Sequence, residues 1–243
     1  MKSNFRIIHF LAIISLSLIF ACQNSSPEKE ETTQISEPRD FTNIPINKEN
    51  DFTRQMSELN KLGMDTTQKI PQGLKPGMRA PVFRGTDQNG KTVSLMEELT
   101  KGSVVLVFYR WQWCGVCNRH LAELADSLDV IQQNGTSVIA VAPEIVEYAK
   151  QTQEKTGLDI TIISDSDLTI MNAYDVTFRV NQNYQEKIVN YAKNSIPNMN
   201  GMEDAYLPVP ATYVINPAGI ITYVHFDQNY RNRLSVKELL ESL

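Results

Sequence analysis

Two closely spaced cysteines follow directly after an apolar run in this chain. Residues 104–109 read Val-Val-Leu-Val-Phe-Tyr, and residues 113–117 read Trp-Cys-Gly-Val-Cys. A spacing of two residues on a helical turn brings the sulfurs of Cys114 and Cys117 close enough to bond, so the dithiol can be oxidised and reduced reversibly. A buried strand that leads into a loop and then a helix is a typical setting for such a pair. The pattern therefore predicts a redox site.

The nucleophile at such a site is a thiolate, and its surroundings determine how easily it forms. We expect a helix over 117–133, whose N-terminal partial positive charge and free N–H groups lower the pKa of the Cys114 thiol. Arg110, Arg119 and His120 lie nearby in the sequence and are candidates for the same effect. These residues favour attack by the first cysteine and resolution of the mixed disulfide by the second.

A metal site is the non-enzymatic alternative for the same residues. Structural zinc requires four ligands. Cys114, Cys117 and His120 are available, and His225 is a possible fourth ligand. A soft site of two cysteines and one histidine suits Cu(I). A copper-binding chaperone is therefore an alternative function for this chain. The redox interpretation itself requires no cofactor and no metal.

The N-terminal residues 1–22 resemble a bacterial lipoprotein signal. Lys2 and Arg6 are basic, residues 7–20 are mostly apolar, and a small residue precedes Cys22. We expect Cys22 to be lipidated and to become the new N-terminus, with ordinary signal cleavage or an uncleaved anchor as alternatives. This predicts a protein anchored by lipid to a membrane of the bacterial cell envelope, with its domain in the periplasm or at the outer surface.

The cysteine count sharpens this interpretation. The chain has three cysteines, and lipidation of Cys22 leaves only Cys114 and Cys117. There is thus no structural disulfide framework, and any internal disulfide of the mature chain joins this pair. The formal net charge is -5 and no long basic run occurs, which argues against nucleic acid as a partner.

The positioning elements begin after a polar segment. Residues 23–48 are rich in Glu, Ser, Thr, Asn and Pro, and this composition predicts a disordered tether. Residues 49–71 are expected to hold a short helix and a linker, and residues 72–243 the redox domain. The apolar residues with helical spacing in the second segment are Phe52, Met56, Leu59 and Leu62.

Within the domain, strand and helix patterns alternate at short spacing. The pattern Ser94-x-x-Glu97 predicts a capping box that opens a short helix, and Ser235-x-x-Glu238 predicts another before a last helix that ends at Leu243. We expect strands over 81–83, 91–93, 103–109, 137–142, 160–163, 212–215 and 219–226, helices over 117–133, 144–155, 165–174 and 183–194, and a loop over 199–207. This order predicts an α/β, thioredoxin-like fold with a central mixed sheet flanked by helices.

Pro210 lies just before the strand predicted over 212–215. In a thioredoxin-like fold such a proline is cis and faces the cysteine pair, and the residue before it contacts the backbone of a partner. We therefore expect Val209, Pro210 and Trp113 to form a partner-docking surface.

Four segments resemble the peroxiredoxin-like branch of the alkyl hydroperoxide reductase/thiol-specific antioxidant family. They are residues 77–83, 107–118, 173–179 and 207–215. The resemblance covers about residues 72–243, includes an insertion over 176–208, and implies a thioredoxin-like fold and thiol-dependent redox activity.

The family's Pro-x-x-x-Thr-x-x-Cys pattern places its peroxide-attacking cysteine on Cys117. The threonine then falls on Cys114 and the proline on Arg110. The resemblance also implies an active-site arginine, for which Arg179 is the best candidate.

Two enzymatic hypotheses follow. The first is an exported, membrane-anchored thiol–disulfide oxidoreductase, in which Cys114 attacks a protein disulfide and Cys117 resolves it. The second is a peroxidase in which Cys117 forms a sulfenic acid, Cys114 condenses with it and Arg179 orients the peroxide. In both, a thioredoxin-type or membrane thiol reductant restores the dithiol.

Overall fold

The computed structural model describes residues 48–157 and 159–243. Residues 1–47 lie outside the described residues, so the predicted signal, the lipidated Cys22 and nearly all of the predicted tether stay predictions. No helix among the described residues combines the length and the apolar character needed to cross a membrane.

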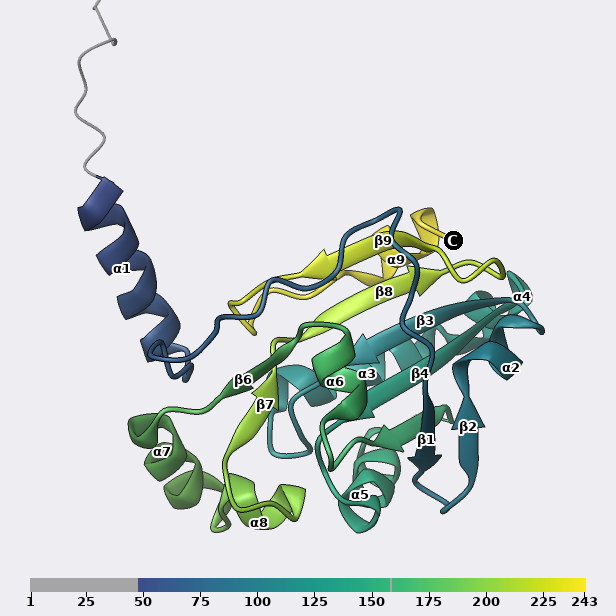
Figure 1. The fold of residues 1–243 in the computed structure, drawn as a ribbon. Helices are drawn as coiled ribbons and strands as arrows, with labels where there is room; N and C mark the ends of the chain where they lie inside the picture. The colour runs from purple at the N-terminus through teal and green to yellow at the C-terminus, as the bar shows by residue number, and fades with distance from the viewer. Residues whose placement is uncertain (1–47, 158) are drawn as a thin grey trace, which may run out of the picture. The chain divides into compact units, whose positions relative to one another are not determined.

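A seven-stranded mixed sheet forms the centre of the domain (Figure 1). Its strands are β1 (Arg84–Asp87), β2 (Thr92–Ser94), β3 (Ser103–Phe108), β4 (Thr136–Ala142), β5 (Thr161–Ser164), β8 (Ala211–Ile215) and β9 (Ile221–Phe226), in the order β2-β1-β5-β4-β3-β8-β9. The neighbours β3, β4 and β5 are parallel, and the other pairings are antiparallel. The predicted α/β arrangement with a central mixed sheet and flanking helices is confirmed.

Side chains of β3 alternate between two apolar cores, because successive residues of a strand point to opposite faces. Val105 and Val107 pack in one core, and Leu106 and Phe108 in the other. The first core is covered by α3 (Gly115–Asp126), α4 (Leu128–Gln133), α5 (Val146–Thr156) and α9 (Val236–Glu241), and the second by α2 (Leu95–Leu99) and α6 (Thr169–Ala173). The apolar run that precedes the cysteines is therefore the buried central strand that the sequence predicts.

A third core lies around the insertion. Its elements are α1 (Lys48–Lys61), β6 (Thr177–Arg179), α7 (Gln182–Ala192), α8 (Ile196–Asn200) and β7 (Tyr206–Pro208). β6 and β7 pair in a separate two-stranded sheet, and α7 and α8 lie next to each other (Figure 1). The predicted helix before residue 63 is confirmed, with Leu59 buried, but Phe52 is 63% exposed and does not pack.

Several predicted boundaries are wrong in detail. The helix expected over 117–133 is two helices, because Ser127 leaves the helical region at φ -110° and ψ 5°. The loop expected over 199–207 contains the end of α8 and the start of β7; α8 is opened by a cap from the Ser195 side chain and by a proline in its first turn. The first predicted strand lies a few residues later, as β1.

The prediction of a cis peptide bond before Pro210 is wrong, because every peptide bond among the described residues is trans. The backbone runs from β7 through Val209 into β8 with only two residues between the strands, and the Val209 N–H donates to the Val176 carbonyl at 2.7 Å. A trans bond keeps this chain extended between its two pairing partners and is also the intrinsically favoured isomer.

Candidate active site

Parallel pairing of β3 with β4 brings two loops to the same edge of the sheet. Phe108 lies opposite Val141, and the Tyr109 N–H donates to the Val141 carbonyl at 3.1 Å. The loop after β3 carries Arg110 and leads to Cys114, while the loop after β4 carries Glu144. The carboxyl edge of a parallel sheet is where functional groups of α/β proteins gather.

Both cysteines are free thiols at the start of α3. Cys114 is the N-cap residue, and its Sγ accepts a hydrogen bond from the Cys117 N–H at 3.4 Å. The Cys114 residue is 4% exposed and Cys117 is 0% exposed. The prediction that the pair opens a helix directly after a buried strand is confirmed.

Arg233 contacts the second sulfur directly, and no local pattern in the sequence points to this contact. Its Nη2 donates to the Sγ of Cys117 at 3.1 Å, and its Nε donates to the Tyr230 carbonyl at 2.8 Å. Both residues lie in the segment between β9 and α9, more than a hundred residues after the cysteines. A cation that donates to sulfur favours the thiolate over the thiol.

Arg110 is held beside the thiols by aromatic rings. Its guanidinium carbon lies 4.0 Å from the ring centre of Tyr230, 5.1 Å from that of Tyr184 and 5.2 Å from that of Trp113. Its Nη2 also donates to the Tyr184 hydroxyl. Ring faces attract a cation, so the three aromatic side chains fix a buried positive charge at the site.

The two thiols differ in acidity, in the opposite order to the one predicted. A hydrogen bond to Cys117, followed by burial, raises the pKa of Cys114. Burial also acts to raise the pKa of Cys117, but the hydrogen bond from Cys114 and the charges of Arg233 and Arg110 outweigh it, and the pKa falls to about 5. These effects favour the thiolate on Cys117 and the proton on Cys114. The charge of Arg110 acts to lower the pKa of both thiols, whereas Arg233 donates its hydrogen bond to Cys117.

The other predicted tuning residues do not supply charge to the thiols. Arg119 is exposed to solvent. His120 is buried, and burial together with the charge of Arg233 lowers its pKa to about 4. His120 is thus neutral at pH 7 and cannot stabilise a thiolate as a cation.

Arg179, the arginine expected to orient the peroxide, also lies outside the thiol site. Arg179 is on β6, where its Nη2 forms an ion pair with the Asp204 Oδ1 at 2.7 Å. It lines a pocket together with Lys69 and Asp175, and none of the residues that line this pocket belongs to the thiol site. The role expected for Arg179 is wrong in this structure, where Arg110 and Arg233 are the arginines beside the sulfurs.

The expected docking surface forms only in part. Trp113 is half-buried and lies against Arg110, as its place beside the first cysteine suggests. Val209 and Pro210 are buried, and the Val209 N–H already donates within the chain. The prediction that Val209 and Pro210 present a free surface to a partner is therefore wrong.

The ligands considered for copper do not converge. In the part of the chain that the structure describes, no group of three or more histidine, cysteine or acidic side chains is placed to hold a metal ion. The His225 Nε2 instead lies 3.4 Å from the Asn232 carbonyl oxygen. The copper-binding alternative therefore finds no ligand set among these residues.

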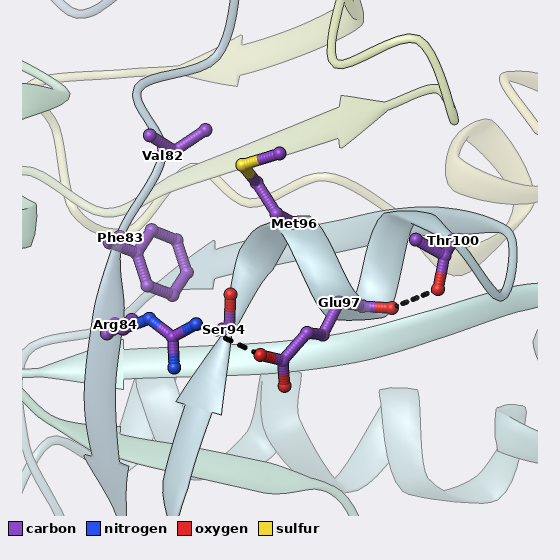
Figure 2. Close-up of a pocket in the computed structure, with 7 residues that line it drawn as sticks. All are labelled: Val82, Phe83, Arg84, Ser94, Met96, Glu97 and Thr100. Atoms are coloured by element: carbon purple, nitrogen blue, oxygen red, sulfur yellow. Dashed lines mark hydrogen bonds and ion pairs between the residues drawn. The ribbon is translucent and has the colours of Figure 1, made fainter.

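A cavity of about 640 Å³ lies away from the thiols. It is formed by the segment before β1, by β2 and by α2, with Met96 and Phe83 at its wall (Figure 2). Arg84 and Glu97 form an ion pair across it at 3.1 Å. None of its lining residues belongs to the site described above, so this cavity takes no part in the thiol chemistry.

Comparison with known proteins connects this geometry to characterised chemistry. Residues 76–224 match the family model described as AhpC/TSA family. The chain is 23% identical over 154 residues to the thiol-disulfide oxidoreductase ResA of Bacillus subtilis, which covers 63% of this chain and 68% of ResA. It is 31% identical over 104 residues to the peroxiredoxin Bcp of Escherichia coli, which covers 42% of this chain and 65% of Bcp.

The fold is also similar to solved structures. The peroxidoxin BcpB of Mycobacterium tuberculosis superposes with a TM-score of 0.54, over 70% of this chain and 96% of BcpB. The sequence identity of this pair is 18%, so the likeness establishes the fold and no more.

Proposed function

The chain belongs to the AhpC/TSA family of thiol-dependent oxidoreductases, and we propose that its redox cycle runs through Cys114 and Cys117. One observation carries this proposal. The Cys117 sulfur accepts a hydrogen bond from Arg233, which together with the charge of Arg110 and the hydrogen bond from Cys114 lowers the pKa of Cys117, while the pKa of the neighbouring Cys114 is raised. A nucleophile and a resolving thiol are the two groups that a dithiol–disulfide cycle requires.

The acidities favour Cys117 as the sulfur that attacks first. Its thiolate breaks the O–O bond of a peroxide, which leaves a sulfenic acid on Cys117 and an alcohol after the alkoxide takes up a proton. The Cys114 thiol then condenses with the sulfenic acid, forming the disulfide and releasing water. A thioredoxin-type or membrane dithiol supplies two electrons and one proton to restore the thiolate and the thiol, and its second proton replaces the one that the alkoxide took up.

Burial favours a small substrate. Both sulfurs are almost completely covered, so the two bulky sides of a protein disulfide cannot reach Cys117 without movement of the chain. The Nε and Nη1 of Arg110 are buried and have no hydrogen-bond partner among the described residues. Buried donors without partners are costly, and a peroxide oxygen is a suitable acceptor for them.

Exchange with a protein disulfide is the second candidate. Cys114 is the sulfur that retains some exposure, it sits at the N-cap of α3, and the half-buried Trp113 lies next to it. The similarity to a thiol-disulfide oxidoreductase supports this candidate. In this cycle Cys114 attacks after losing its proton, and Cys117 resolves.

Single-cysteine variants separate the two cycles. The variants Cys114→Ser and Cys117→Ser are treated with hydrogen peroxide or with a protein disulfide, and the adducts are identified by mass spectrometry. We expect Cys114→Ser to accumulate a sulfenic acid on Cys117 and Cys117→Ser to react slowly with peroxide. Mixed disulfides trapped on Cys114, without peroxide turnover in the wild type, would instead establish the second cycle.

We also propose that the protein is exported and held on a membrane of the bacterial envelope through Cys22. The support is the sequence of residues 1–22. Metabolic labelling with palmitate should mark the wild type and not Cys22→Ser, and the variant should leave the membrane fraction. Equal labelling of both proteins would contradict the anchor.

A further inference from the structure

Arg233 reaches the second sulfur from a turn in the chain between β9 and α9. Its Nη2 donates to the Cys117 Sγ at 3.1 Å, and its Nε donates to the Tyr230 carbonyl at 2.8 Å. A guanidinium carries its donors in one rigid plane, so the hydrogen bond at Nε also fixes the direction of Nη2. The geometry of the turn therefore determines whether the guanidinium points at the sulfur.

The carboxylate of Asp227 closes this turn by accepting two hydrogen bonds from within it. The Asn229 N–H donates to Oδ1 and the Asn232 Nδ2 donates to Oδ2, each at 2.7 Å. The Asn232 N–H also donates to the Asn229 carbonyl at 2.9 Å, and the Arg231 N–H donates to the Asn229 Oδ1 at 3.3 Å. Side-chain acceptors of this kind hold a turn that lacks a regular ladder of backbone bonds. Asp227 thus joins the two sides of the turn around Tyr230.

Two contacts dock the turn on other parts of the molecule. The Tyr230 ring centre lies 4.0 Å from the guanidinium carbon of Arg110, which belongs to the loop that leads to Cys114. Arg110 is buried and forms none of the ion pairs among the described residues, so the ring face is a favourable place for its charge. The Gln228 Nε2 donates to the Pro71 carbonyl at 3.2 Å, in the segment before β1. The turn is therefore held against the loop that carries the first cysteine.

The charge of Asp227 serves no ion pair. No pair among those of the described residues includes it, and its oxygens accept from uncharged amide groups. A carboxylate in the same turn as Arg233 disfavours a thiolate by its charge alone. Its place is explained by the hydrogen bonds that close the turn.

We propose that residues 227–233 form a positioning device for Arg233. In it, Asp227 closes the turn, and the Tyr230 ring docks the turn on the loop that leads to the cysteines. The inference rests on the proposed role of Cys117 as the sulfur that attacks first. It assigns Asp227 and Tyr230 as positioning residues that act on this sulfur through Arg233.

The test measures the rate at which iodoacetamide alkylates Cys117, as a function of pH, in a Cys114→Ser background. Asp227→Ala should raise the pKa of Cys117 and slow alkylation at pH 5 roughly threefold, because the guanidinium is released from the sulfur. By charge alone, loss of a carboxylate would have the opposite sign, since it favours a nearby thiolate. An unchanged or faster rate in Asp227→Ala would overturn the inference.

Double variants test whether the effect passes through Arg233. In an Arg233→Met background, neither Asp227→Ala nor Tyr230→Leu should cause further slowing, because the contact that both residues support is already lost. These variants leave the other titratable groups beside the sulfur unchanged, which are Tyr109, Arg110 and Glu144. Further slowing by the same factor would mean that the turn acts by another route, and would overturn the inference.

The ring of Tyr230 is tested with a conservative pair of variants. Tyr230→Leu removes the ring face and should slow alkylation, whereas Tyr230→Phe keeps it and should restore the parent rate. Asp65→Ala is the matched control, because the Asp65 carboxylate also closes a turn, after α1, by accepting from the Thr67 N–H at 3.1 Å and the Thr67 hydroxyl at 2.6 Å. This control should keep the parent rate. Equal slowing in Tyr230→Leu and Tyr230→Phe, or slowing in Asp65→Ala, would overturn the inference.

The outcome is separate from that of the peroxide experiment, because iodoacetamide reacts with the thiolate whether or not the redox cycle operates. If Cys114→Ser forms no sulfenic acid on Cys117 while alkylation responds to Asp227→Ala as expected, the proposed cycle fails and the positioning of Arg233 stands. If the cycle runs and alkylation does not respond, only this inference fails.

Discussion

At the scale of single residues, the charge on Cys117 depends on a side chain supplied from the far end of the sequence. Arg233 donates to the sulfur at 3.1 Å, whereas Arg119, two residues after the cysteine, is exposed. Arg110 lies in the loop that leads from β3 to Cys114, and its guanidinium, held among aromatic rings, adds a second positive charge. Position in the fold, and not closeness in sequence, therefore determines which cations lower the pKa of Cys117.

We predict that Arg233→Met raises the pKa of Cys117, because it removes both a donated hydrogen bond and a nearby positive charge. Alkylation of Cys117 in a Cys114→Ser background should slow roughly tenfold at pH 5, where the wild-type thiolate is still populated. Arg231→Met is the matched control. Its guanidinium stacks on Tyr230 at 4.6 Å and makes no contact with sulfur, so its alkylation rate should match the parent. Equal slowing in both variants would mean that Arg233 acts by holding the segment rather than by its charge.

The sequence predicts the sulfurs of the site better than their surroundings. Cys114 and Cys117 are found from a local pattern, because strand, loop and helix are contiguous there. Glu144 and Arg233 reach the site only through strand pairing and the turn after β9, which no local pattern specifies. The predicted order of acidity fails for the same reason, since it relied on the helix end and not on the distant arginine.

At the scale of elements, two identical capping signatures have different outcomes. Ser235 and Glu238 form the full capping box at the start of α9, with the Ser235 Oγ accepting from the Glu238 N–H at 3.2 Å. Ser94 begins α2 without any side-chain cap, and the Glu97 carboxylate pairs with Arg84 on the neighbouring strand. The sequence signature thus predicts the helix start in both cases but does not predict whether the capping bonds form.

We predict that Ser235→Ala lowers the free energy of unfolding by about 1 kcal/mol, since it leaves an N-terminal N–H of α9 without its acceptor. Ser94→Ala has the same chemistry and no cap to lose, so its cost should be below about 0.5 kcal/mol. Urea unfolding of the two variants and the wild type measures both values. Equal losses would show that the capping bonds do not account for the stability of α9.

Short elements of the insertion lie beyond local prediction. β6 and β7 have three residues each, and their pairing joins segments almost thirty residues apart. By contrast, α5 is predicted nearly to its last residue, because Gly157 takes the left-handed conformation at φ +67° and ends the helix. A boundary fixed by a backbone preference is visible in the sequence, and one fixed by a distant partner is not.

At the scale of the whole molecule, buried titratable groups act in opposite directions on stability. Burial raises the pKa of Glu144 and of Asp165 to about 7, so between pH 4.5 and 7 the folded state binds protons that the unfolded state has released. These two groups lower stability as pH rises through that range. Burial lowers the pKa of His120 to about 4, so His120 raises stability as pH rises from 4 to 6.5. The lowered pKa of Cys117 acts in the same direction as His120 above pH 5.

Because these contributions oppose one another, the free energy of unfolding of the wild type should change little between pH 5 and 6.5. Removing one of the titratable groups should reveal the contribution of that group. Asp165→Asn removes a group that loses its proton on unfolding. Its stability relative to the reduced wild type should therefore increase by about 1 kcal/mol per pH unit between pH 5 and 6.5, whatever the constant cost of the substitution. Urea unfolding at several pH values gives this slope. Asp65→Asn is the control: hydrogen bonding to the Thr67 hydroxyl and N–H lowers the pKa of Asp65, so it is ionised in both states over this range and its relative stability should not vary with pH. A flat difference for Asp165→Asn would mean that the Asp165 carboxylate stays ionised in the folded protein, satisfied by the two backbone N–H groups that it accepts from.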